Sequence, residues 1–331
     1  MPIQKIKRRN LKQACLYEPM ITKLIIPPNS LWLSPMEGVS DLGFRKICFD
    51  RGAKLTFTEM IRADALVRGN KSTLELIDSY IKSIPTGIQL LVSKPEILKK
   101  VLNLIIQQRT EKKAQFMNIS AIDLNFGCPS PEIISQGSGP ALLKRTARMR
   151  ELLTILKELS PVPCGIKIRL GLNAKEKKEK VYLNIIKIAN EVKLDWITVH
   201  PKTADQKSTD PIDLAALKEI AACSSIPIIG NGLVINGHQA KQLLDLGCQG
   251  VMIARGAIIN PWIFEEINYY LNTGEQKSFP KNYNQAYQEY RDIALKYNTK
   301  KKYIEYHHQT FLQHLAGDLS YHSPSNIRKW N

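Results

Sequence analysis

The sequence predicts a closed (β/α)8 barrel, the TIM-barrel fold, followed by a small C-terminal helical domain. Eight short apolar runs bounded by turn residues recur along the chain, which is the pattern of buried strands. Longer segments with helical spacing separate most of these runs, as the crossover connections of a parallel sheet require. Polar residues and glycines gather just after the runs, at the edge where barrel enzymes hold their active sites.

The apolar runs are nearly continuous rather than alternating, which indicates strands buried on both faces. Eight strand and helix units in roughly 240 residues match the length of a closed barrel. An open, doubly wound sheet is the alternative, and the polar residues after the strands favour the barrel. The predicted strands are 31–34, 55–58, 87–92, 121–125, 163–168, 196–200, 227–230 and 250–253.

Helical spacing predicts the connecting helices and two more in the tail. A change of composition after Gly256 and a polar stretch at 272–282 place a domain boundary near residue 275. Six tyrosines lie between Tyr283 and Tyr306, and we interpret them as core residues of the tail helices rather than as base-stacking rings. The predicted domains are a basic N-terminal extension (1–25), the barrel (26–275) and the helical domain (276–331). The clearest helices are 147–159, 181–192, 214–223 and 237–246 in the barrel, with 283–297 and 303–315 in the tail.

Composition limits the function. The 331 residues carry 47 Lys and Arg against 30 Asp and Glu, and a net charge of +17 attracts phosphate-rich partners. RNA, DNA and anionic membranes all remain possible on charge alone. Six cysteines without a CxxC pair exclude a zinc ribbon or a disulfide scaffold and predict a reducing, cytoplasmic location. Because no apolar run approaches 18 residues, we expect a soluble protein with no membrane partner, and nothing indicates an obligate protein partner.

Two loops predict a phosphate site. Gly230-Asn231-Gly232 and Ala254-Arg255-Gly256 follow the seventh and eighth strands, whose loops form the phosphate cradle of many barrels. The glycines allow backbone N–H groups to approach an anion, and Arg255 can bind a phosphate oxygen. The barrel and the cradle together predict FMN as cofactor, with Asn231, Gly232, Ala254, Arg255 and Gly256 as its ligands.

Further strand-end residues converge on the same mouth. Gln89, Asn125 and Lys167 suit a flavin, because its ring needs hydrogen-bond partners and a cation near N1. We therefore predict that the cofactor-binding residues also include Pro35, Met36, Gln89, Asn125, Lys167 and His200.

Cys128 is the candidate catalytic residue. It lies in a Gly-Cys-Pro turn after the fourth strand, ahead of a glycine-bearing loop, 135–139, that could close over a substrate. A thiol with a pKa near 8.5 is protonated at neutral pH and can act as a general acid. We expect the other cysteines considered to be small buried residues: Cys48, Cys164, Cys223 and Cys248.

Several motifs follow one another along the chain: Pro35-Met36-Glu37-Gly38-Val39-Ser40-Asp41, Thr58-Glu59-Met60, Asn125-Phe126-Gly127-Cys128-Pro129, Gly137-Ser138-Gly139, Lys167-Ile168-Arg169 and the two phosphate loops. Together they closely resemble those of the tRNA-dihydrouridine synthases over residues 31–265, and more weakly to Arg328. The resemblance implies an FMN barrel and a helical domain that together clamp tRNA, with NADPH or NADH as reductant. It implies hydride transfer from flavin N5 to uracil C6 and protonation of C5 by Cys128.

The resemblance also implies that Gln206 and Lys202 bind substrate, although Lys202 stands where the family has Arg. Leu233 and Pro140 are further departures, and none of the three removes a catalytic group. Two alternatives stay open: an FMN barrel acting on a small molecule, like dihydroorotate dehydrogenase, and a tRNA-binding protein without redox activity. The basic charge and the helical domain argue against the first, and the presence of Cys128 and Lys167 argues against the second.

Overall fold

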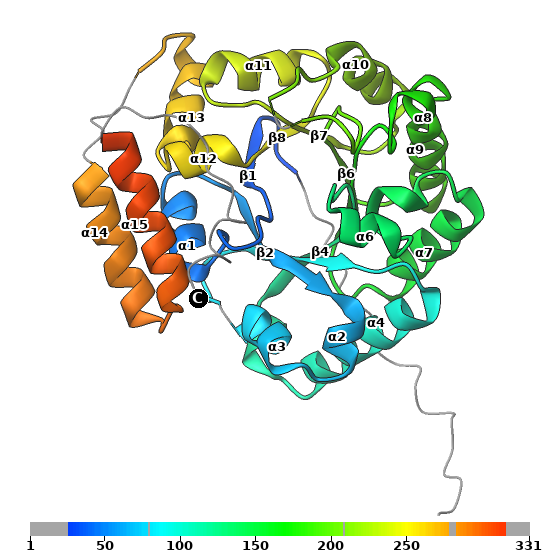
Figure 1. Cartoon of the computed structure of the whole chain (residues 1–331), viewed down its shortest axis with the longest axis horizontal. Helices are drawn as coiled ribbons and strands as arrows, with labels where there is room; N and C mark the ends of the chain where they lie inside the picture. Colours follow the sequence, from blue (N-terminus) through cyan, green and yellow to red (C-terminus); the bar gives the residue numbers. More distant parts are fainter. Residues whose placement is uncertain (1–25, 79, 208, 278–282, 316–331) are drawn as a thin grey trace, which may run out of the picture.

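The computed structural model describes residues 26–78, 80–207, 209–277 and 283–315, and in these residues eight parallel strands form a closed barrel. Each strand pairs with the next in the sequence, and β8 closes the ring by pairing with β1, Ser30 opposite Gly250 (Figure 1). The predicted fold class is therefore confirmed. The strands are β1 Ser30–Leu33, β2 Leu55–Arg62, β3 Thr86–Leu91, β4 Ile119–Phe126, β5 Cys164–Ile168, β6 Trp196–Val199, β7 Ile228–Asn231 and β8 Gly250–Ile253.

Helices surround the strands as an outer ring (Figure 1). The longest barrel helices are α4 Pro95–Thr110, α7 Thr146–Leu159 and α9 Val181–Val192. The others are α1 Leu42–Asp50, α2 Ala63–Val67, α3 Lys71–Asp78, α5 Ala114–Met117, α6 Pro131–Ser135, the 3-10 helix η1 Gly139–Leu142, α8 Ala174–Lys178, α10 Leu214–Cys223, α11 Gly237–Asp245, α12 Arg255–Ile259 and α13 Ile263–Thr273.

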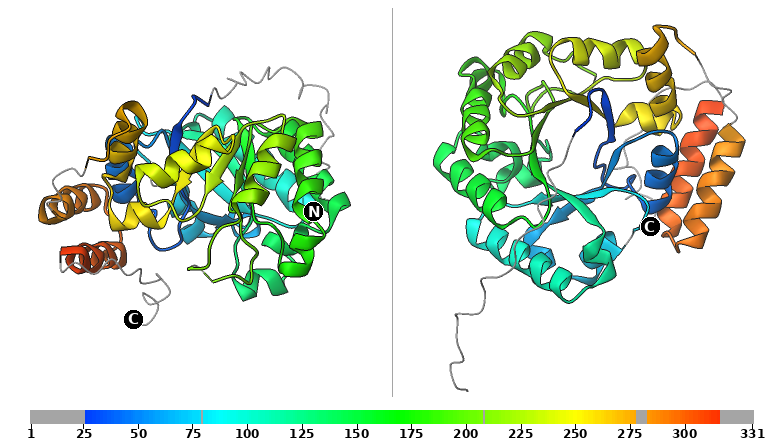
Figure 2. Two further views of the ribbon diagram at one scale, coloured as in Figure 1. Left: turned by 90° about the horizontal axis from the view of Figure 1, so that it is seen from above. Right: turned by 180° about the vertical axis from the view of Figure 1, so that it is seen from behind.

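Two tail helices, α14 Tyr283–Lys296 and α15 Lys301–Leu315, lie side by side against the α1 side of the barrel (Figures 1 and 2). The carboxylate of Asp41 makes contacts with both parts. Its Oδ1 caps α1 by accepting from the N–H groups of Gly43 and Phe44. Its Oδ2 accepts from the Tyr290 hydroxyl at 3.3 Å and lies 3.0 Å from Nε2 of His307. The tail therefore completes the beginning of the first barrel helix.

The tail tyrosines are mostly core residues, as predicted. Tyr290, Tyr303 and Tyr306 are buried, whereas Tyr297 is exposed. The Tyr303 hydroxyl donates to Glu59 of β2, which also accepts from the N–H of Gly38 near the barrel mouth. The basic extension 1–25 and the end of the tail, 316–331, lie outside the described residues.

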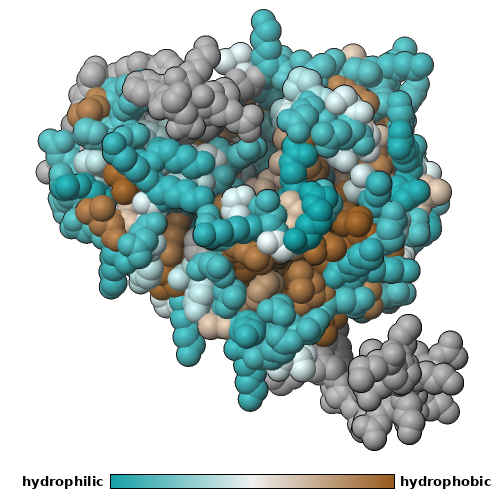
Figure 3. Space-filling model, turned by 60° about the horizontal axis from the view of Figure 1, so that its bottom comes forward, coloured by the Kyte–Doolittle hydropathy of each residue, from teal (hydrophilic) through white to brown (hydrophobic). Residues whose placement is uncertain are grey.

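The surface is largely hydrophilic in the view of Figure 3, where the largest apolar area lies near the centre and smaller ones lie at the left. Among the helices of the described residues, none is both long enough and apolar enough to cross a bilayer.

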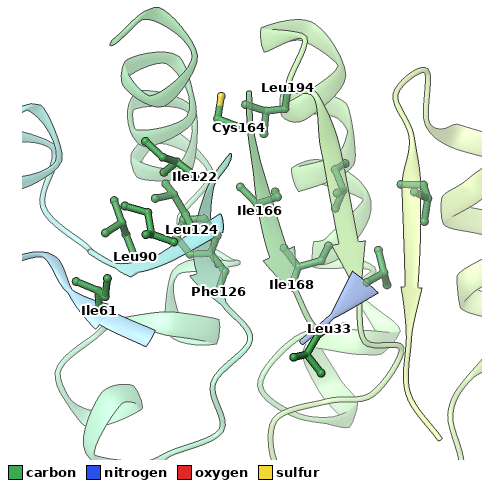
Figure 4. Packing of buried hydrophobic residues seen from close by; sticks show 14 of the residues in the cluster. Leu33, Ile61, Leu90, Ile122, Leu124, Phe126, Cys164, Ile166, Ile168 and Leu194 are labelled. Atoms are coloured by element: carbon green, nitrogen blue, oxygen red, sulfur yellow. The ribbon is translucent and has the colours of Figure 1, made fainter. Parts of the chain in front are cut away.

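The core has two layers. The larger one lies between the strands and the outer helices and includes Leu90, Leu124, Ile166 and Ile168 (Figure 4). The smaller one fills the barrel itself, where the rings of Trp32 and Trp196 meet edge to face at 5.5 Å. Because strands with two apolar neighbour layers need apolar residues at most positions, the runs in the sequence are nearly continuous.

All eight predicted strands are confirmed, with ends that differ by up to four residues. The largest difference is in β2, which was predicted to end at Thr58 but continues to Arg62. The prediction ended early because the polar residues Thr58 and Glu59, at a register shift within the strand, interrupt the apolar run. One prediction about the cysteines is wrong. Cys48, Cys164 and Cys248 are buried, but Cys223 is exposed because it is the last residue of α10.

Candidate active site

Cys128 follows the carboxyl end of β4, at the mouth of the barrel, and is partly buried. The side-chain oxygen of Asn125 holds its turn, because it accepts hydrogen bonds from the N–H groups of Gly127 at 3.1 Å and Cys128 at 2.9 Å. The turn that carries the thiol is thus held by a side chain of β4.

A chain of hydrogen bonds supports Asn125 from inside the barrel. Its Nδ2 donates to Oε1 of Gln89 at 2.7 Å, and Nε2 of Gln89 donates to Oδ2 of Asp123 at 2.7 Å. Nε1 of Trp196 donates to the other oxygen of Asp123 at 3.3 Å. The sequence-based prediction missed Asp123. Its spacing of two residues from Asn125 places both on one strand face, and this was the signal available.

The loop after Cys128 folds back onto the turn. Gly139 has φ +60, and a Cβ there would lie 3.0 Å from the Ile133 side chain and 3.4 Å from the carbonyl oxygen of Cys128. Arg62, at the end of β2, binds Glu132 of α6 at 2.7 Å. The segment predicted as a closing loop therefore packs against the thiol turn and is anchored to a second strand.

Lys167 of β5 lies beside Asn125 in the strand register. Its ammonium makes no hydrogen bond or ion pair with any described residue. Burial, with Arg169 nearby, lowers the pKa of Lys167 to about 8, although Asp123 and Cys128 act in the opposite direction. A cation with no protein partner at this depth suits an anionic or strongly polar ligand.

Arg169 belongs to the Lys167-Ile168-Arg169 motif but was not predicted to be a site residue. Its Nε donates to the carbonyl of Gly127 at 2.8 Å, and a terminal nitrogen donates to the carbonyl of Thr203 at 2.7 Å. It therefore ties the Cys128 turn to the loop after β6. Burial lowers the pKa of Arg169, whose guanidinium still stays charged at neutral pH because the ordinary value is 12.5.

Burial raises the pKa of the Cys128 thiol, and the nearby Glu37 acts in the same direction. The N–H of Ser130 and the cations Arg169 and Lys167 oppose this rise without cancelling it. The thiol is therefore protonated at neutral pH, which is the form that can donate a proton.

On the other side of the mouth is a cavity of about 580 Å³, lined by both predicted phosphate loops. Gly232 has φ +131, and a Cβ there would lie 2.9 Å from both the His200 ring and Ile212. The side chain of Asn231 is directed to the carbonyl of Met252 at 2.7 Å, which joins β7 to β8. The lining includes His200, Asn231, Gly232, Ala254, Arg255 and Gly256.

His200 tests whether a cofactor fits this cavity. Its Nε2 is buried and has no hydrogen-bond partner among the described residues. Burial lowers the pKa of His200 far below its ordinary value, and Lys167, Arg169, Lys202 and Arg255 add to the effect. A neutral imidazole nitrogen without a partner, next to a glycine-lined cavity, fits a polar ligand such as a flavin phosphate or ribityl chain.

The remaining predicted residues occupy the same mouth or its border. Pro35 and Met36 follow β1, and the N–H of Met36 donates to Ser40 at 2.9 Å. Lys202 is fully buried and its ammonium donates to the carbonyl of Lys207 at 3.2 Å. Gln206 uses its side-chain oxygen to accept from the N–H of Thr203 at 2.8 Å. Substrate contacts of Lys202 and Gln206 stay predictions.

Comparison with known proteins gives a consistent result. The dihydrouridine synthase (Dus) family model matches residues 32–329. tRNA-dihydrouridine synthase B of Pseudomonas aeruginosa is 31% identical over 250 residues, which cover 75% of this chain and 71% of that protein. The enzyme of the same name from Xanthomonas axonopodis is 31% identical over 244 residues, or 73% and 70% of the two chains.

Solved structures show the same fold at low sequence identity. Morphinone reductase superposes with a TM-score of 0.51 at 13% identity, over 77% of this chain and 88% of that one. DHODH from Eimeria tenella gives a TM-score of 0.50 at 13% identity, over 77% and 81%. At this identity the likeness concerns the barrel alone.

Proposed function

We infer the chemistry of this site from one premise: the chain belongs to the dihydrouridine synthase family. Its activity is the reduction of uridine in tRNA to dihydrouridine, and it uses a flavin. The main support for the roles proposed below is that Cys128 and Lys167 lie at the ends of neighbouring strands in the barrel mouth. The same mouth contains a glycine-lined cavity, where the buried Nε2 of His200 has no partner among the described residues.

We propose that the flavin is FMN. Its single phosphate suits the loops 230–232 and 254–256, where Arg255 supplies charge and Gly232 leaves room for close approach. His200 and Asn231 would hold the chain that joins the phosphate to the ring. Gln89, Asn125 and Lys167 would contact the ring, together with Pro35 and Met36 from the loop after β1. When bound, FMN supplies the hydride, which it receives from NADPH or NADH.

Cys128 would donate the proton to C5 of the uracil. Its thiol is protonated at neutral pH, and its turn is fixed by Asn125 and Arg169. A proton donor of this kind contributes because it is already positioned when negative charge develops on the base. Lys202 and Gln206 would support the substrate side of the mouth through the loop after β6.

The tRNA backbone would follow a basic groove beside the Cys128 loop. This groove is a cavity of about 670 Å³ between the end of β3 and the start of α7. Lys94 and Arg145 line it without an ion pair to any described residue. Lys144 and Arg148 add two more cations, each with an acid at 3.5 Å or more. Uracil has to be flipped out of the RNA, and phosphate contacts of this kind offset the cost of unstacking. The helical tail, on the α1 side of the barrel, would contact the tRNA from the opposite side of the mouth.

The test combines flavin content with substrate choice. Purified protein loaded with FMN should oxidise NADPH faster when unmodified tRNA is added, and mass spectrometry should find dihydrouridine in that tRNA. Orotate serves as the matched small-molecule control and should not be turned over. Turnover of orotate without tRNA would favour a dihydroorotate dehydrogenase-like enzyme, and failure to bind FMN would favour a tRNA-binding protein.

A further inference from the structure

We propose that Asp123 is a positioning residue that sets the orientation of the Gln89 and Asn125 amides and, through them, the turn that carries Cys128. The proposal deepens the proposed function, since it concerns the same site. Two of its measurements, thiol reactivity and amide exchange, do not depend on tRNA reduction.

The geometry is a single directed chain. Asp123 lies fully buried in the barrel and accepts from Gln89 at 2.7 Å and from Trp196 at 3.3 Å. Gln89 in turn accepts from Asn125 at 2.7 Å. Asn125 accepts from the N–H groups of Gly127 and Cys128. Every bond runs in one direction, from the thiol turn toward the carboxylate.

An ionised carboxylate is what gives the chain its direction. A side-chain amide can donate or accept, so Gln89 and Asn125 could each turn over if nothing fixed them. An ionised carboxylate only accepts, so Gln89 must present its NH2 group to Asp123 and its oxygen to Asn125. Asn125 must then present its NH2 group to Gln89 and its oxygen to the turn. If the Asn125 amide turned over, its NH2 group would face the backbone N–H of Cys128, and two donors would meet.

The barrel makes room for the second donor on Asp123. Trp196 reaches it across β5, where a Cβ at Gly165 would lie 2.3 Å from the indole ring. Glycine at this position therefore lets the indole enter the barrel interior. Both carboxylate oxygens of Asp123 then accept from an N–H donor, which favours the ionised form.

Charge and burial act on Asp123 in opposite directions. Burial raises its pKa, and Gln89, Lys167 and Trp196 lower it; the combined result is a pKa of about 7, so the carboxylate is mostly ionised at pH 7.5. The ammonium of Lys167 on β5 lowers the pKa of Asp123 by attraction between opposite charges. It therefore favours the ionised form, which only accepts hydrogen bonds, as the chain requires.

Asp123→Asn is the direct test because it keeps the shape and removes one acceptor. Its NH2 group must face either Trp196 or Gln89, and each of these presents a donor. We expect the amide chain to reverse and the Cys128 turn to loosen. Alkylation of Cys128 by iodoacetamide should become about threefold to tenfold faster at pH 7.5. The exposed Cys223 in the same molecule is the internal reference, and its rate should stay unchanged.

The double variant Asp123→Asn/Trp196→Phe separates orientation from packing. Phe removes the indole donor, so the new NH2 group can face the ring while the oxygen again accepts from Gln89. Thiol reactivity and dihydrouridine formation should both return toward those of Trp196→Phe alone, which is the matched control. Equal Cys128 reactivity in wild type and Asp123→Asn, or a double variant no better than Asp123→Asn, would overturn the proposal.

A measurement on the wild-type protein covers the case in which the variants do not fold. The side-chain NH2 protons of Gln89 and Asn125 should exchange with solvent at least about tenfold more slowly than those of Gln242, which is exposed on α11. Exchange at the rate of Gln242 would contradict a fixed amide chain. If tRNA reduction itself is absent, the thiol and exchange results still decide the role of Asp123.

Discussion

The two sides of the barrel mouth satisfy their polar groups in different ways. On the Cys128 side, Asp123, Gln89 and Asn125 bind one another and the thiol turn with distances of 2.7 to 3.3 Å. On the phosphate side, the buried Nε2 of His200 has no partner among the described residues and faces a cavity of about 580 Å³.

This difference separates two tasks. A buried polar atom without a partner costs about 1–3 kcal/mol, which binding of a suitable ligand can recover. The phosphate side is therefore completed by its cofactor. On the Cys128 side, the hydrogen bonds that hold the thiol turn are already made, so the proton donor is in position before cofactor or substrate arrives. Loss of Arg255 on the first side should therefore weaken cofactor binding, and loss of Cys128 on the second should slow the reaction.

The largest effect is expected from Cys128→Ala. Loss of a general acid slows a reaction by about 100-fold to 10,000-fold, so dihydrouridine formation should fall by at least about 100-fold. The FMN dissociation constant, measured by quenching of flavin fluorescence, should stay within about twofold, because no cofactor contact is removed. Cys223→Ala is the control and should keep full activity. A tenfold change of the FMN dissociation constant in Cys128→Ala would contradict the assignment of catalysis and FMN binding to different sides of the mouth.

Arg255→Ala should have the reverse profile. A hydrogen bond to a charged group contributes about 1.5–3 kcal/mol, so the FMN dissociation constant should rise about tenfold to 100-fold. Alkylation of Cys128 in the flavin-free protein should not change. Arg150→Ala removes an exposed arginine that pairs with Glu191 on the outer helices and should leave both quantities unchanged. If Arg255→Ala changed the rate of Cys128 alkylation and left the FMN dissociation constant unchanged, the assignment of the phosphate-binding loops would be wrong.

A substitution in the groove beside the Cys128 loop should weaken tRNA binding and leave FMN binding unchanged. Each phosphate contact lowers log K by about 0.7–0.9 per unit of log salt concentration, so Arg145→Ala should reduce that slope by about one unit. Affinity at low salt should fall by about fivefold to tenfold. FMN binding should be unaffected. A salt slope equal to that of wild type would show that tRNA does not cross this groove.

The most gradual effect is a pH dependence of FMN binding, because it develops over more than one pH unit. The pKa of Lys167 in the cofactor-free protein is about 8, below its ordinary value. If an anionic ligand favours the charged form, affinity is constant below pH 8 and declines above it, by at most tenfold per pH unit. Titration of FMN binding from pH 6.5 to 9.5 measures this, and Lys167→Met should show no decline there. An affinity that rises between pH 8 and 9.5 would contradict this assignment of Lys167.

Much of the fold and the site followed from the sequence because strands, loops and motifs are local. All eight strands were predicted, and the loops 230–232 and 254–256 do line one cavity. Asp123 escaped prediction because an acid inside an apolar strand has meaning only through its neighbours on β3 and β6. The two hydrogen bonds of Arg169 were missed for the same reason, since they join loops of different strands. Exposure of Cys223 depended on where α10 ends.

Asp41 and His307 lie 266 residues apart, and no periodicity in the sequence connects them. Their contact has a consequence for how the protein unfolds. Separation of the tail would strip a buried carboxylate of two partners at the point where α1 begins, and α1 lies beside the strands that form the mouth. We therefore expect barrel and tail to melt in a single cooperative transition, so that the tail is part of the enzyme's folding unit rather than a detachable module.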